Sequence, residues 1–170
     1  MNERRPPLVV NGWTIYAHPL FLDQLEALIK QVDALKQKDP AGFAKKNAAK
    51  RLAAIAKLAF EVIPQDPTRA EYRQGNTLGG EHKHWFRAKF FQQYRLFFRY
   101  HDQAKVVVFA WVNDEETKRA YESADDAYRV FRNMLDSSHP PTDWDRLLGE
   151  ARAEVDRFKK AASSASAAQL

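Results

Sequence analysis

The chain has 170 residues, 45% of them hydrophobic, and we predict a single domain over residues 1–160 followed by a disordered Ala/Ser tail over residues 161–170. The chain has no cysteine, which excludes disulfides and cysteine nucleophiles. It also has no run of about 18 apolar residues, which disfavours export or a membrane span, so we expect a cytoplasmic protein. The formal net charge of +5 favours polyanionic partners such as RNA.

The N-terminal part is predicted to contain one strand and two helices. Residues 11–17 (NGWTIYA) alternate in polarity, which indicates a short strand. Apolar residues then recur at helical spacing between residues 21 and 35, and a second helix is predicted over residues 41–63. The Lys and Arg residues of this second helix indicate a solvated face, with an RNA or ribosome contact as the alternative.

The middle of the chain is predicted to form a long loop and a three-stranded meander. Residues 64–83 are rich in Pro, Gly and polar residues, which is typical of a surface connection. Three strands are predicted over residues 84–91, 94–101 and 105–112, joined by connections short enough for hairpin turns and therefore antiparallel. The third is apolar on both faces, as expected of a central strand.

Helices are predicted again in the C-terminal part, one over residues 125–136 and a last one that begins after two prolines. Thr142 and Asp145 are predicted to cap this last helix. The predicted fold class is therefore α+β, with a small antiparallel sheet packed against N-terminal helices and with C-terminal helices.

One face of the predicted strand pair combines cations with aromatic rings. Because side chains alternate along a strand, Arg87 and Lys89 point to the same side, as do Arg95 and Arg99 on the next strand. Such a surface can bind phosphates and stack unpaired bases, although a merely solvated face is the alternative. The residues predicted to contact RNA are Trp85, Phe97, Arg99 and His101.

These residues could cleave RNA without a metal ion if the 2′-hydroxyl group attacks the adjacent phosphate. Arginine stays protonated, so Arg87, Arg95 and Arg99 are candidates for phosphate binding and charge stabilisation. Lys89 could act as the base if the neighbouring cations favour its neutral form. The candidates for proton transfer that remain are His101, Tyr121 and Tyr128.

A metal site is the less favoured interpretation of the histidines. His82 and His84 could share an ion, but the sequence has no HExxH motif, no cysteine and no clustered carboxylates beside them. We therefore predict no metal ion and no cofactor. A non-catalytic RNA- or ribosome-binding module is the alternative function, because it would need the same cationic surface but no acid or base.

The chain resembles the YhaV family of type II toxins in six segments that follow one another in the same order and spacing. They cover about residues 10–148: NGWTIYAHPLF, KKNAAKRL, LGGEHKHWFRAKFFQQYRLFFRY, WVNDEETKRAY, DAYRVFRNML and HPPTDW. The alternating WxRxKF pattern followed by YRLFFRY and a W-x-ND turn is more restrictive than any single block.

The resemblance implies a RelE-like fold and an endoribonuclease that inhibits translation. It also implies a PrlF-type antitoxin as partner, RNA that is free or ribosome-bound as substrate, and operator DNA contacted only through the antitoxin complex. By position, the paired basic residues of the wider RelE group fall on Arg87 and Lys89, and the arginine of its YR motif falls on Arg95. The later arginine falls on Arg119, and the tyrosine on either Tyr121 or Tyr128.

Overall fold

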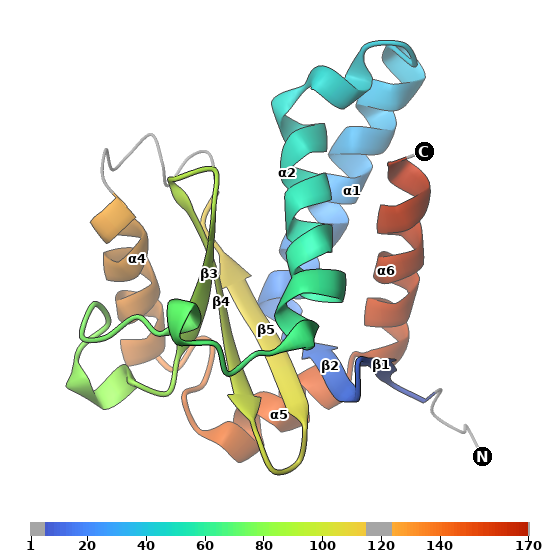
Figure 1. Ribbon diagram of the computed structural model, residues 1–170. Coiled ribbons are helices and arrows are strands. Elements are labelled where there is room, and N and C mark those ends of the chain that lie inside the picture. Colours follow the sequence, from blue (N-terminus) through green and yellow to red (C-terminus); the bar gives the residue numbers. More distant parts are fainter. Residues whose placement is uncertain (1–5, 115–123, 170) are drawn as a thin grey trace.

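The computed structural model describes residues 6–114 and 124–169 and shows an α+β fold (Figure 1). A five-stranded mixed sheet has the strand order β1-β2-β5-β4-β3. The strands are β1 (Leu8–Val10), β2 (Trp13–Ala17), β3 (Phe86–Phe90), β4 (Tyr94–His101) and β5 (Val106–Val112). The helices are α1 (Pro19–Lys38), α2 (Asn47–Lys57), α4 (Ala124–Asp136), α5 (Trp144–Arg152) and α6 (Val155–Ala168).

The predicted meander is confirmed, but the sheet is not purely antiparallel. Strands β3, β4 and β5 pair in antiparallel order, whereas β2 pairs with β5 in parallel, from Thr14 opposite Val106 to Ala17 opposite Phe109. The N-terminal strand β2 also forms an antiparallel hairpin with β1. Asn11 and Gly12 form the turn of this hairpin, at φ values of 51° and 80°. Local alternation predicts a strand but not the distant strand with which it pairs.

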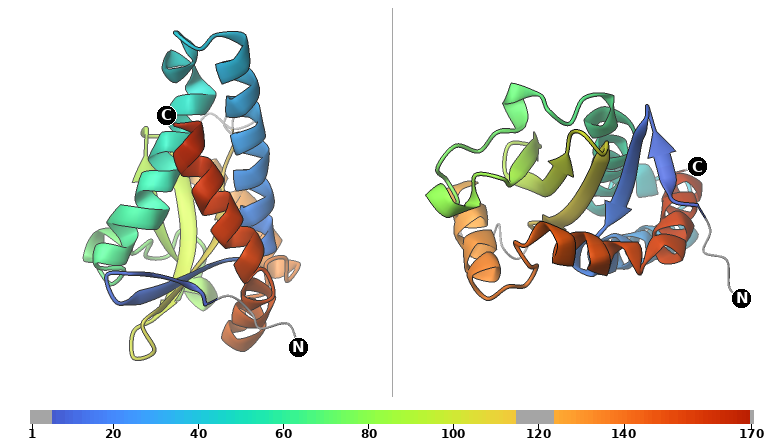
Figure 2. Two further views of the ribbon diagram at one scale, coloured as in Figure 1. Left: turned by 90° about the vertical axis from the view of Figure 1, so that its right-hand side faces the viewer. Right: turned by 90° about the horizontal axis from the view of Figure 1, so that it is seen from below.

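Both faces of the sheet are covered, which explains why β5 is apolar on both sides. Helices α1, α2 and α6 pack on one face, and α4 and α5 pack on the other together with Leu78 and Trp85 of the loop before β3 (Figures 1 and 2). Each face carries its own cluster of buried apolar residues, with Phe98 and Phe109 in the first and Phe97 and Phe131 in the second. The cationic strand face is therefore the floor of a second core and not an open surface.

The second predicted helix is shorter than expected. Residues Phe43–Lys45 form a 3₁₀ turn, and α2 begins only at Asn47 because Lys46 has an extended backbone. The helix then widens into a π-helical segment, Leu58–Val62, and a 3₁₀ turn, Ile63–Gln65. Proline at residue 64 lacks an amide proton and clashes with a preceding turn of α-helix, which accounts for this ending.

The C-terminal prediction needs two corrections. The last helix is in fact two helices, α5 and α6, and the residue that caps α5 is Asp143, whose carboxylate accepts a hydrogen bond from the amide of Arg146 at 3.0 Å. The tail predicted to be disordered is helical as far as Ala168. Alanine has the highest helix propensity, and the buried methyl groups of residues 161, 165 and 168 let α6 lie close to α1.

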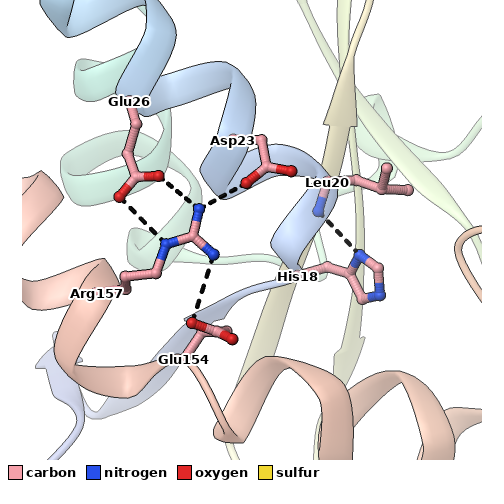
Figure 3. A network of polar contacts seen from close by, with 6 residues as sticks. All are labelled: His18, Leu20, Asp23, Glu26, Glu154 and Arg157. Atoms are coloured by element: carbon pink, nitrogen blue, oxygen red, sulfur yellow. Dashed lines mark hydrogen bonds and ion pairs between the residues drawn. The ribbon is translucent and has the colours of Figure 1, made fainter.

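A guanidinium group also joins α6 to α1. Arg157 on α6 donates hydrogen bonds to Glu26 and to Asp23, the latter at 2.6 Å, and contacts Glu154 at 3.4 Å (Figure 3). These carboxylates raise the pKa of Arg157, chiefly because Glu26 accepts hydrogen bonds from the guanidinium group. In the described ranges, no helix has the length and hydrophobicity needed to cross a membrane.

Candidate active site

The strand register brings the predicted cations together. Lys89 on β3 lies directly opposite Arg95 on β4, and Arg87 lies opposite Phe97. Because residues that face each other across antiparallel strands have Cβ atoms about 4.5–5.5 Å apart, the three cationic side chains start from neighbouring points of the sheet. The alternation of charged and apolar residues in the two strands predicted this placement correctly.

Tyr128 on α4 joins the two arginines. Its phenol oxygen accepts a hydrogen bond from Nε of Arg87 at 2.8 Å and another from Nε of Arg95 at 3.0 Å. The tyrosine is 5% exposed, and Arg95 is 6% exposed. A single phenol oxygen therefore lies between two guanidinium groups that come from adjacent strands.

Backbone carbonyls hold the same arginines from the other side. Nη1 of Arg87 donates to the carbonyl of Glu71 at 2.6 Å, so the loop before β3 contributes to the site. Nη1 of Arg95 donates to the carbonyls of Gln92 and Tyr94, at 2.7 and 3.0 Å. These partners are neutral, so they satisfy hydrogen bonds without neutralising the two positive charges.

Asn113 is a site residue that the sequence prediction missed. Its side-chain oxygen accepts from the amide of Arg95 at 2.7 Å, and its side-chain nitrogen donates to the carbonyl of Gln93 at 3.0 Å. The residue is 2% exposed, just beyond β5, and fixes the β3–β4 turn against Arg95. Its place in the W-x-ND block, directly after an apolar strand, was the signal that could have identified it.

The cations differ in access to solvent. Arg95 is buried and Arg87 is half-buried, while the Lys89 side chain is exposed. An incoming phosphate can therefore reach Lys89 and the open side of Arg87 more readily than it can reach Arg95. In this arrangement Arg95 positions Tyr128 and the hairpin, and the other two are better placed to touch a ligand.

The prediction that Trp85 and Phe97 stack on RNA is wrong. Both side chains are 0% exposed, and both rings pack on Phe131 of α4, with centroid distances of 5.1 and 4.3 Å. Alternation identified the correct side of each strand, but α4 covers that side. These aromatic residues build the second core and cannot present a ring face to a base.

Arg99 and His101 also lie outside this cluster. Arg99 lies four residues from Arg95, about 13 Å along the strand, and its guanidinium carbon lies 5.8 and 5.3 Å from the ring centres of Trp85 and Trp144. It donates to the carbonyl of Thr142, and burial lowers its pKa. His101 is exposed at the end of β4, where its Nδ1 accepts from the amide of residue 104.

Two predicted catalytic residues, Arg119 and Tyr121, lie outside the described residues. The structure places Tyr128 between the arginines, and the choice between the two tyrosines stays a prediction. Among the histidines, His84 is exposed, whereas His82 is buried with its Nε2 3.4 Å from a carboxylate oxygen of Asp136 and 4.0 Å from Glu81. Asp136 lies eight residues beyond Tyr128 on α4, about 12 Å away, so this contact is separate from the arginine pair.

Comparison with known proteins identifies the family. Residues 15–152 match the family Toxin_YhaV, described as a toxin with endonuclease activity, of a toxin–antitoxin system. The chain is 47% identical to Toxin YhaV of Escherichia coli O6:H1 and 46% identical to Ribonuclease toxin YhaV of Escherichia coli (strain K12), each over 146 residues that make up 85% of this chain and 95% of the relative. No solved structure gives a significant match. The chain therefore belongs to the YhaV family of toxins with endonuclease activity, which are components of toxin–antitoxin systems.

Proposed function

We propose that this protein is an endoribonuclease that cleaves RNA without a metal ion and thereby inhibits translation. The observation that carries the proposal is the Tyr128 phenol held between the guanidinium groups of Arg87 and Arg95, beside the exposed Lys89. A site with two fixed cations, a lysine amine and a phenol offers both charge stabilisation and proton transfer. The name of the E. coli relative, a ribonuclease toxin, supports RNA as the substrate.

The proposed reaction is an internal transesterification. The 2′-hydroxyl oxygen attacks the adjacent phosphorus while the bond from phosphorus to the 5′-oxygen breaks, which yields a 2′,3′-cyclic phosphate and a 5′-hydroxyl end. The proton of the 2′-hydroxyl passes to a base, for which Lys89 is the candidate, and a second proton passes to the leaving 5′-oxygen. Atoms and charge balance without a co-reactant.

The remaining residues have separate tasks in this scheme. Arg87 donates to the phosphate oxygens that gain negative charge, which is the stabilisation that fixed cations supply best. Tyr128 gives its proton to the leaving oxygen, and both guanidinium groups then face the phenolate. Arg95 is a positioning residue, because it is buried and bound to backbone carbonyls.

For its biological partners, we propose a PrlF-type antitoxin and RNA that is either free or on the ribosome. Operator DNA would be contacted only through the antitoxin complex, and the cytoplasm, where messenger RNA is translated, would be the location. The family description supports the antitoxin itself, and the resemblance of the six sequence blocks supports its type. The exposed Lys89 and the half-buried Arg87 fit a polyanionic substrate.

The decisive test is RNA cleavage by the purified protein in the presence of a chelator, with and without ribosomes. We expect new 2′,3′-cyclic phosphate and 5′-hydroxyl ends, and a rate about 10²–10³-fold lower for Arg87→Ala. Arg146→Ala, which removes an exposed arginine of α5, is the matched control and should cleave normally. Binding of RNA without new ends would instead support the non-catalytic alternative, and a fully active Arg87→Ala would show that the site is elsewhere.

A further inference from the structure

The tip of the β3–β4 hairpin carries an aromatic side chain that the proposed reaction does not use. Phe91 is 52% exposed and, with Val9, is one of two large hydrophobic residues found exposed in residues 6–114 and 124–169. The aromatic residues that surround it in sequence are buried or half-buried. The ring packs edge-on against Phe90 at a centroid distance of 5.5 Å, but its exposed surface forgoes the stabilisation that burial would provide, so this packing alone does not explain its presence.

The backbone at this position is also unfavourable for a phenylalanine. Phe91 and Gln92 have φ values of 46° and 62°, in the left-handed region that Gly, Asn and Asp adopt most readily. Hairpin turns with this geometry normally contain those residues, whereas this turn reads Phe-Gln-Gln. A glycine would fit the backbone with less strain, so the chain keeps a bulky ring where the turn itself does not need one. Strain of this kind is found where a side chain serves a function.

Contacts with the site hold this turn in place. Arg95 donates to the carbonyl of Gln92 at 2.7 Å, and Asn113 donates to the carbonyl of Gln93 at 3.0 Å. The exposed Lys89 lies two residues before Phe91, and in Figure 1 the hairpin tip lies at the same end of the sheet as the first turn of α4. The backbone of the turn that carries Phe91 is thus held by the same arginine that positions Tyr128, and the ring projects from a turn of defined geometry.

We propose that Phe91 is a base-stacking subsite, on which an unpaired base next to the cleaved phosphodiester rests. This inference deepens the proposed function, because it names how the same site binds single-stranded RNA. Every base has an apolar face that stacks on an aromatic ring, and a cation beside the ring binds the phosphate that joins that base to the next. The subsite takes over the stacking role for which Trp85 and Phe97 are too deeply buried.

The first test uses a short single-stranded RNA and the same RNA with one abasic nucleotide placed at each position in turn. Loss of one base stacked on an aromatic ring lowers affinity about 5- to 150-fold. We expect Phe91→Ala to raise KM by a factor in this range with a smaller change in kcat. Phe91→Trp, which keeps an aromatic ring, should have a KM close to that of the wild type, and Val9→Ala should leave KM unchanged. At one position of the RNA, the abasic nucleotide should lower the affinity of the wild type by a similar factor. The same nucleotide should not lower the affinity of Phe91→Ala any further.

The second test separates stacking from a structural role of the ring. Phe91→Gly relieves the left-handed backbone, so its melting temperature should equal or exceed that of the wild type while its KM rises as in Phe91→Ala. Affinity measured on an RNA in which 2′-deoxy residues block cleavage must show the same loss. That measurement keeps the two proposals apart, since a protein that binds RNA through Phe91 but never cuts it contradicts the proposed function alone.

Three results would overturn the stacking proposal. One is a Phe91→Ala variant that cleaves and binds RNA like the wild type. Another is a loss of equal size at every abasic position in both proteins, which would mean that no particular base contacts the ring. If Phe91→Ala cleaves normally but escapes neutralisation by the antitoxin, the ring contacts a protein, and stacking on RNA is wrong.

Discussion

Replacing Tyr128 with phenylalanine tests the central geometry of the site. The substitution removes one oxygen atom and leaves the ring, which packs edge-on against Phe97 at a centroid distance of 5.6 Å. That oxygen accepts hydrogen bonds from both Arg87 and Arg95, at 2.8 and 3.0 Å. Its loss leaves two guanidinium donors without an acceptor and removes the proposed proton donor.

The expected effects on stability and on rate differ in size. A hydrogen bond to a charged group contributes about 1.5–3 kcal/mol, but half-buried Arg87 can recover water, so the loss comes mainly from Arg95, which is 6% exposed. We therefore expect Tyr128→Phe to lower the free energy of unfolding by about 1.5–3 kcal/mol. Loss of a positioned proton donor lowers the cleavage rate about 10²–10⁴-fold, which corresponds to about 2.7–5.4 kcal/mol in the barrier.

Urea titration and cleavage of a labelled RNA measure the two effects, and Tyr72→Phe is the matched control. Tyr72 is 4% exposed, and its hydroxyl has no hydrogen-bond partner in the part of the chain that the structure describes. Removing this hydroxyl should leave stability equal or higher and leave cleavage unchanged. A Tyr128→Phe variant that is folded and cleaves RNA at the wild-type rate would refute the assignment of the proton donor.

Three further predictions concern stability. Arg157→Ala should lower the free energy of unfolding by about 1–2 kcal/mol, because three carboxylates contact the guanidinium group and solvent partly screens its charge at 35% exposure. An unchanged midpoint of urea unfolding would show that this network contributes nothing to stability. Burial lowers the pKa of His18 from 6.5, so the unfolded chain takes up a proton before the folded chain does, and the free energy of unfolding should fall as the pH falls from about 6.5 to the lower folded pKa. The variant His18→Asn keeps a side-chain cap for α1 and should make this pH dependence weaker. An equal pH dependence in the variant would mean that other groups cause it. Trp85→Ala should cost about 3–5 kcal/mol, as expected for a fully buried ring, and a variant that stayed as stable as the wild type would contradict the burial seen for this ring.

The amino-acid sequence by itself determined the local elements and the family. Strand alternation placed Arg87 and Lys89 on one side of β3 and Arg95 on the same side of β4, because side chains point to opposite faces in turn whatever the rest of the chain does. Short connections made the meander antiparallel for an equally local reason, and the spacing of apolar residues located α1 and α4. Local alternation is therefore enough to place these three cations on one face of the strand pair.

Only the tertiary structure decided what covers each surface. Whether Phe97 faces solvent or a core depends on where α4 packs, and α4 follows β4 by more than 20 residues. The same long-range packing brings Tyr128 to the arginines, aligns β2 with β5 and lays α6 on α1. The periodicity of the sequence indicates to which side of a strand a residue points. Whether that side is buried depends on the free energy of excluding water between elements that are far apart in the chain, and a local pattern carries no information about those contacts.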